Sequence, residues 1–261
     1  MGPMSVRTLE YFGIRQLVVD NLGEGSITVS AGADPDRVEG SIDAGDDAFL
    51  AAVQIHQARE ALRISLPQGF WRSTTSHLKL LVPHGLRFVI KTGAADVAIS
   101  VDIGPSRIVT GSGDVTLASA VDLECSTGSG NIDVTELTGS GARLRTGSGH
   151  LMIGAASCPV SVRSGSGHID INSLNRSELQ ASSGSGEVLV SSTTGSIDVR
   201  SASGMITVGV AEGLPAWLDL ASTSGEVRVG LDAIGQPEPG EAYISVRART
   251  ASGGIGVVRA V

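Results

Sequence analysis

Aliphatic and polar residues alternate along most of this chain, in short stretches that end at glycine-rich turns. The pattern is most regular between residues 109 and 230, where the motif Thr/Ser-Gly-Ser-Gly-x-aliphatic-x-aliphatic occurs five times and two further copies carry Ala or Thr in the second place. Successive motifs are 17, 19, 18, 19, 18 and 21 residues apart, measured at their second glycines, Gly113, Gly130, Gly149, Gly167, Gly186, Gly204 and Gly225. A nearly constant repeat of this length predicts a solenoid.

Each repeat contains two short alternating stretches. Aliphatic residues stand two and four places after the second glycine, and a second pair, such as Leu179 and Ala181, stands seven and five places before it. A period of two predicts a strand with one buried face. Glycine and serine at this density argue against a helix. We therefore predict coils with two strands and two turns each, and we attribute the turn glycines to a need for positive φ.

One coil cannot stand alone, because four inward aliphatic side chains do not offset the entropy lost on ordering a whole repeat. Stacked about 4.8 Å apart, the coils gain parallel backbone hydrogen bonds and a shared aliphatic core. The predicted fold is therefore all-β: a single-stranded parallel β-helix, or β-solenoid, with about 18 residues per coil.

The remainder of the chain is a less regular version of the same pattern, and we predict one continuous domain. Residues 5–108 form irregular N-terminal coils and a capping region, residues 109–230 the regular repeat, and residues 231–261 a loop excursion and a terminal coil. The stack is expected to start at Gly25. A short helical turn over residues 46–52, with Asp46 or Asp47 near its cap, is expected to shield the open end. The last strand, residues 254–258, leaves a pairing edge, which opens end-to-end dimerisation or polymerisation.

Composition and charge bear on the partners and on the location of the protein. Aromatic residues make up 3% of the chain, which suits a thin solenoid core, and the formal net charge of −8 argues against nucleic acid. No apolar stretch is long enough to span a membrane, and the N-terminal residues as given lack the apolar core of a secretory signal. The native start, Met1 or Met4, is left open, and with it a signal that has been removed. We expect a cytoplasmic protein, with peripheral envelope association left open.

A family resemblance rests on three features of the chain. These are the strand, glycine and strand unit at residues 17–29, the stretch Leu62-Arg-Ile-Ser-Leu-Pro67, and the tandem Thr/Ser-Gly-Ser-Gly-x-Ile/Val-x-Val units. Together they resemble the bacterial "putative adhesin" family of β-strand repeats over nearly the whole chain. The resemblance implies a right-handed single-stranded β-helix, a frequent link to the cell envelope, and no catalytic residues.

Two sets of polar residues are candidates for a site. The residues that follow the second glycines form a column at the turns, in which His150, His168 and Glu187 are of the types that bind transition metals. We favour a solvated column without a ligand, and we therefore expect no metal and no cofactor. The second set is a basic face of arginines at outward positions of one strand per coil: Arg143, Arg145, Arg163, Arg200, Arg247 and Arg249.

The basic face predicts binding to an anionic polymer or to phospholipid headgroups. The alternative is a solvated sheet face whose charges suppress aggregation. Trp71 and Trp217 are further candidates for a contact site, or else they cover an edge of their own fold.

Three classes of function fit the sequence. The one we expect is a non-catalytic structural or interaction protein that presents flat faces to an unknown protein or an envelope polymer. The alternative is a self-assembling scaffold similar to bactofilins, a homo-oligomer formed through the exposed terminal coil. A polysaccharide-active β-helix enzyme is third, because compact turns and few aromatic residues leave little room for a sugar-binding groove.

Overall fold

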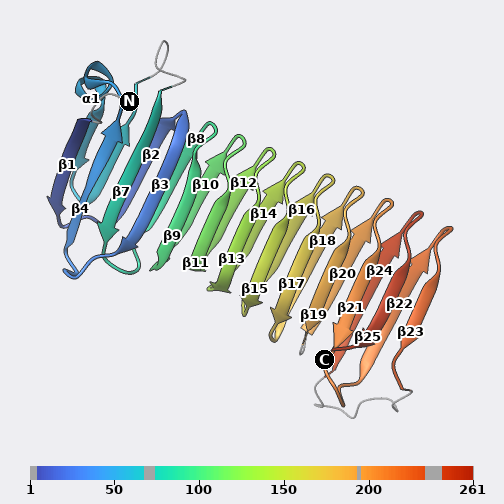
Figure 1. Ribbon diagram of the computed structural model, residues 1–261. Helices are drawn as coiled ribbons and strands as arrows, with labels where there is room; N and C mark the ends of the chain where they lie inside the picture. Colours follow the sequence, from blue (N-terminus) through green and yellow to red (C-terminus); the bar gives the residue numbers. More distant parts are fainter. Residues whose placement is uncertain (1–4, 68–73, 193–194, 233–242, 261) are drawn as a thin grey trace. The chain divides into compact units, whose positions relative to one another are not determined.

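The computed structural model of the 261-residue chain describes residues 5–67, 74–192, 195–232 and 243–260. The chain divides into two compact units, Met1–Asn131 and Ile132–Val261. Each unit consists of two sheets. From β7 onward successive strands contribute to the two sheets alternately, as in the coils of a β-solenoid (Figure 1). The predicted excursion at residues 233–240, Trp71 and the candidate starts Met1 and Met4 lie outside the described residues.

The C-terminal unit holds most of the regular repeats, in two parallel sheets. Sheet I has the order β13 (Ile132–Thr138), β15 (Leu151–Ala156), β17 (Ile169–Leu174), β19 (Val188–Ser192), β21 (Ile206–Val210), β25 (Ile255–Arg259) and β23 (Val227–Gly230). Sheet II has the order β14 (Ala142–Thr146), β16 (Val160–Ser164), β18 (Ser177–Ser183), β20 (Gly195–Ser201), β24 (Ile244–Thr250) and β22 (Ala216–Ser222).

The aliphatic positions of the repeat face the interior between the two sheets. Ile169 pairs with Val188 and Ile171 with Val190 on adjacent strands of sheet I, and all four side chains are at most 1% exposed. β-branched residues suit these positions because they pack well on a pleated surface. The predicted all-β solenoid with two strands per coil is confirmed.

The reason predicted for the turn glycines was wrong. The second glycines Gly113, Gly130, Gly167, Gly186, Gly204 and Gly225 do not adopt positive φ. A Cβ atom added at Gly186 would instead overlap the carbonyl oxygen of Gly167 in the neighbouring coil, and the other five glycines approach a backbone oxygen in the same way. Glycine is required here because stacked corners lie too close together to admit a side chain.

The Thr or Ser that opens each motif closes the turn with its buried hydroxyl group. The N–H of Gly130 donates a hydrogen bond to Thr127 Oγ1 at 3.0 Å, and Gly253 does the same to Thr250 Oγ1 at 3.1 Å. In another coil the Ser164 hydroxyl donates to the carbonyl oxygen of Gly167 at 2.9 Å. A hydroxyl at this position therefore satisfies a backbone group that the tight corner leaves without a ladder partner.

The N-terminal unit also contains two sheets, but the strands do not follow chain order. One sheet has the order β1 (Ser5–Phe12), β4 (Arg37–Ala44), β7 (Thr75–Val82), β3 (Glu24–Ala31), β9 (Asp96–Ile103) and β11 (Val115–Val121). The other has the order β12 (Leu123–Thr127), β10 (Ser106–Thr110), β8 (Arg87–Thr92), β2 (Gln16–Leu22), β6 (Ala61–Ser65) and β5 (Gln54–Ala58). The coil at Gly25 therefore lies between two others and does not start the stack as predicted, because β6 and β7 pair on its outer side.

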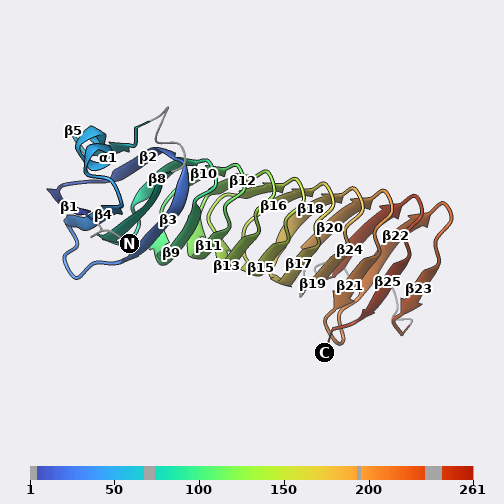
Figure 2. The ribbon, with the colours of Figure 1, turned by 45° about the horizontal axis from the view of Figure 1, so that its top comes forward.

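Antiparallel strands and one short helix close the outer end of the N-terminal unit (Figure 2). The helix α1 (Asp47–Ala52) begins where the Asp46 carboxylate accepts hydrogen bonds from the N–H groups of Ala48 and Phe49, as predicted for its cap. The guanidinium group of Arg7 on β1 donates to the carbonyl oxygen of Val53 at 2.7 Å, just after the helix. An inward charge and a covering helix are two ways of keeping an edge from pairing with another chain.

The C-terminal unit ends differently from the prediction. Strand β24 lies between β20 and β22, and β25 lies between β21 and β23 (Figure 1). The last coil in sequence is thus inserted beneath the preceding one. Strands β22 and β23, rather than residues 254–258, form the outer edge of this unit.

Both cysteines are buried and are not joined in a disulfide. Burial raises the pKa of Cys125 to about 12, as expected for an inward strand position without a charged neighbour. Within the described ranges, the chain forms no helix with the length and apolar character needed to cross a membrane.

Candidate anion-binding face

All six predicted arginines lie on the outer face of sheet II. In β14, β16, β20 and β24 the side chains of the core alternate with exposed arginines. This alternation follows from the strand geometry, since every second side chain points away from the interior. The structure therefore brings together Arg143, Arg145, Arg163, Arg200, Arg247 and Arg249 from strands that span more than 100 residues of sequence.

Parallel pairing aligns these side chains in two columns. Arg145 stands directly opposite Arg163, and Ser182 separates Arg163 from Arg200, which in turn stands opposite Arg249. The second column contains Arg143, Ser161, Gln180, Asp198, Arg247 and Asp219.

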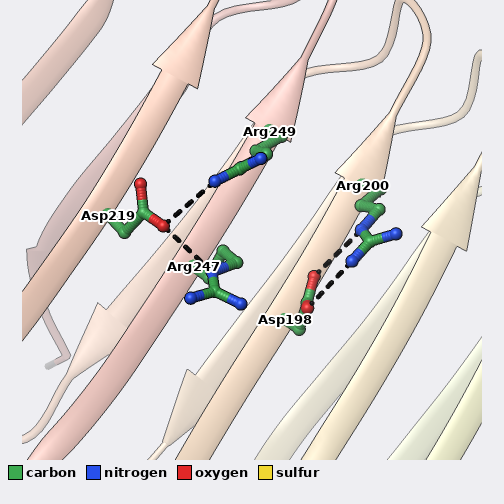
Figure 3. Close-up of polar contacts among 5 residues, drawn as sticks. All are labelled: Asp198, Arg200, Asp219, Arg247 and Arg249. Atoms are coloured by element: carbon green, nitrogen blue, oxygen red, sulfur yellow. Dashed lines mark hydrogen bonds and ion pairs between the residues drawn. The ribbon is translucent and has the colours of Figure 1, made fainter.

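Two aspartates neutralise one end of this face (Figure 3). Asp219 on β22 accepts hydrogen bonds from Arg247 at 2.9 Å and from Arg249 at 3.2 Å, and these bonds hold its pKa below the usual value. Asp198 forms a bidentate contact with Arg200, two residues further along β20, at 3.3 and 3.2 Å. These three arginines already have carboxylate partners.

The other three arginines have no such partner. Within the part of the chain that the structure describes, Arg143, Arg145 and Arg163 form no ion pair with a carboxylate. Like charges directly opposite each other on neighbouring strands destabilise a sheet, as Arg145 and Arg163 do here. An external anion would relieve this repulsion, and the guanidinium group suits phosphate or carboxylate because it donates two parallel hydrogen bonds.

A shallow hollow of about 210 Å³ lies between the two columns. Arg163 and Arg200 line it from either side of Ser182, together with polar side chains of the second column, Ser161, Gln180 and Asp198. Hydroxyl, amide and guanidinium groups are hydrogen-bond donors, so the hollow offers donors at the point where the basic face is concave.

Residues 58–257 match the Toastrack DUF4097 family, which is a domain of unknown function. The chain belongs to this family. Among the curated proteins, none matches the Toastrack chain. This match confirms the family resemblance predicted from the repeats.

Solved structures resemble the Toastrack chain over almost their whole length. A "putative lipid binding protein" from Parabacteroides distasonis is 16% identical, covers 99% of this chain and 98% of its own, and has a TM-score of 0.62. A "putative adhesin" from Bacteroides fragilis is 16% identical over 97% of both chains, with a TM-score of 0.48. At these identities the similarity shows the fold alone.

The polar side chains in the column at the turns form hydrogen bonds between successive coils. The N–H of Asn131 donates to Asp114 Oδ1 at 2.7 Å, and the N–H of Glu187 donates to His168 Nδ1 at 3.1 Å. The rings of His150 and His168 are stacked, with their centroids 5.0 Å apart and their planes 5° from parallel. Among the described residues, no three His, Cys, Asp or Glu side chains converge to hold a metal ion, so the metal hypothesis gains no support.

The outer face of sheet I differs from the basic face. Its central column contains Asp133, Met152, Asp170 and Leu189, so an acidic residue alternates with a half-exposed apolar one. Burial of its carboxylate and the charge of Glu187 raise the pKa of Asp170, whose Oδ1 atom has no hydrogen-bond partner. This column therefore disfavours anions, in contrast to the arginine columns of sheet II.

Asp170→Thr is expected to stabilise the Toastrack chain at pH 7 by up to about 1 kcal/mol, because it removes an unsatisfied carboxylate and places a strand-favouring residue between two apolar neighbours. The pKa of Asp170 is higher in the folded state than its usual value of 3.8, so ionisation costs stability as the pH rises through that range. The gain should therefore shrink below pH 3.8. Urea unfolding at both pH values measures it, and an equal gain at low pH would contradict the electrostatic explanation.

The N-terminal unit contains a second basic hollow that the sequence pattern did not indicate. Arg15, Arg59 and Arg87 line a depression of about 550 Å³ together with Glu60. Arg59 lies in the turn between β5 and β6, at φ 53°, whereas Arg87 opens β8. No repeat register connects these positions, and only the irregular strand order brings them together.

Proposed function

We propose that this Toastrack protein is a non-catalytic interaction protein whose outer face of sheet II binds an anionic envelope surface bearing phosphate groups. The observation that carries the proposal is the cluster of Arg143, Arg145 and Arg163, aligned across neighbouring strands without ion-pair partners in the described part of the chain. A flat face with regularly spaced guanidinium groups matches a repeating polyanion better than a small molecule.

Two further observations support this function. The face is basic although the whole chain has a formal net charge of −8, so the arginines are concentrated locally against the average composition. In addition, the solved structure with the highest TM-score reported above is named a putative lipid binding protein. The hollow between the columns offers the donors of Ser161, Arg163 and Gln180 to a phosphate, and its volume of about 210 Å³ is below the roughly 300 Å³ at which small-molecule pockets begin.

The variant Arg143→Ser/Arg145→Ser/Arg163→Ser tests the proposal. Vesicles of phosphatidylglycerol mixed with phosphatidylcholine serve as the anionic surface, and binding is measured by co-sedimentation. We expect about 100-fold weaker binding in the variant, because each arginine near an anionic membrane contributes about 1 kcal/mol. Binding of the wild-type chain should also weaken as salt is raised.

A matched control removes the same charge elsewhere. Arg37→Ser/Arg63→Ser/Lys79→Ser loses three cations from the N-terminal unit, each of which lies in an exposed ion pair. This control should bind the vesicles nearly as well as wild type. Equal loss in both variants would indicate a net-charge effect, and unchanged binding in the first variant would rule out the basic face.

A further inference from the structure

The outer coil of the C-terminal unit, formed by β22 and β23, is incomplete on one side. Val227 and Val229 hold the inward positions of β23 but are 41% and 49% exposed, whereas Val188 and Val190 at the same repeat positions are 0% exposed. Within the described ranges, neither β22 nor β23 pairs with a strand beyond it. This end therefore presents core side chains together with two unpaired strand edges.

The exposure is specific to this end. In the N-terminal unit, α1 and antiparallel strands cover the outer coil, and Arg7 points inward there. The described residues of the C-terminal unit include no helix and no antiparallel strand at β22 and β23. An apolar edge without such protection is a template for pairing with another chain.

We propose that the open end of the C-terminal unit binds a second copy of this chain through a two-fold axis that pairs β23 with β23 of the second copy. An axis perpendicular to the strands and crossing both sheets reverses strand direction. It therefore makes β22 and β23 each meet their counterpart as an antiparallel pair. The contact lies at the ends of the sheets, away from the outer face that carries the arginines.

The charges at and beside β23 favour one register. Opposed residues in an antiparallel pair point to the same face, so the axis must pass through a residue, which can be Val227, Arg228, Val229 or Gly230. An axis at Arg228 places that residue against its own copy, and an axis at Val229 places Glu226 against Asp232 of the second copy. An axis at Gly230 opposes Arg228 to Asp232, which lies two residues beyond the end of β23. Only the axis at Val227 places Glu226 opposite Arg228 of the second copy, twice by symmetry. Glu226 and Arg228 already form an ion pair at 2.7 Å within one copy, so this axis brings two such pairs together in alternating order.

The backbone agrees with this register. The carbonyl oxygen of Glu226 accepts a hydrogen bond from the N–H of Ile255 at 2.9 Å, so the polar groups of Glu226 face β25. Because these groups alternate in direction along a strand, the N–H and C=O groups of Val227 point toward the open side. Two copies of Val227 can then exchange both hydrogen bonds across the axis.

The arrangement closes on itself. A two-fold contact uses the same surface on both copies, so the edges of β22 and β23 are fully paired in the dimer and no free edge is left at this end to add a third copy. This distinguishes the proposal from a head-to-tail filament of the bactofilin kind.

Charge reversal across the register provides the test, measured by sedimentation velocity over a range of concentrations. The wild-type chain should form dimers, and Glu226→Arg or Arg228→Glu alone should weaken them about tenfold or more, since each change places like charges opposite each other at two symmetric positions. The double variant Glu226→Arg/Arg228→Glu restores both opposed pairs and should dimerise within about threefold of wild type.

Asp198→Arg is the matched control, because Asp198 and Arg200 have the same spacing within β20 but lie away from the open end. It should leave dimerisation unchanged. A wild-type chain that stays monomeric, a double variant that fails to recover, or assemblies larger than a dimer would each overturn the proposal. Circular dichroism of every variant confirms that the sheets remain folded.

Discussion

Gly186→Ala is expected to destabilise the C-terminal unit by about 3 kcal/mol or more, although it adds a single methyl group. The added Cβ atom would overlap the carbonyl oxygen of Gly167 in the adjacent coil. A backbone atom cannot rotate away as a side chain does, so relief requires the two coils to separate locally. Separation breaks parallel hydrogen bonds on both sides of the corner. Urea unfolding followed by circular dichroism measures the loss.

Gly141→Ala is the control for this substitution. Gly141 does not have positive φ, and a Cβ atom there would meet the nearest oxygen, that of Pro159, at 3.4 Å, which is an ordinary contact. The change should alter stability by less than about 1 kcal/mol. If both variants lose the same stability, the close approach of the corners is not the reason for glycine.

Val190→Ala is expected to cost about 2 to 3 kcal/mol, because it removes two methyl groups from a side chain that is 0% exposed and leaves a cavity between Ile171 and Val208. Val229→Ala is the matched variant, since Val229 holds the same place in its repeat but is 49% exposed and has a described neighbour, Val257, on one side only. Its cost should be about 1 kcal/mol or less.

The comparison must be made in dilute solution, where association through β23 does not bury Val229 further. Chemical unfolding of each variant and of wild type gives the two differences in free energy. Equal losses at the two positions would contradict the finding that the outer coil is incomplete.

The repeat pattern predicted most of the fold because one rule applied to every coil. Residues such as Ile169 and Val188 are both inward and aligned, since their distance from the preceding glycine fixes their place in the coil. The same rule places all six arginines on one face, since each stands at an outward position of its strand. It also located the turn glycines correctly, but the reason for them depends on distances between coils, which a single repeat does not contain.

The ends could not be predicted from the same rule. It assumes that coils stack in chain order, whereas β6 and β7 pair outside the coil at Gly25 and β24 and β25 pair inside the preceding coil. The residues of one strand do not determine which of two strands it pairs with when both have the same alternation of inward and outward residues. The partners of the arginines were missed for a related reason, because Asp219 reaches Arg247 and Arg249 only through the inserted strand.

The insertion of β24 and β25 has a consequence for how the protein is made. A solenoid with coils in chain order can fold progressively as it leaves the ribosome, each new winding adding to a finished one. Here β22 and β23 are synthesised before the two strands on which they rest. Strands β22 and β23 therefore reach their native pairing only after residues 244–259 have been synthesised and have inserted between them and the preceding coil. The outer coil is completed by strands that are made after it.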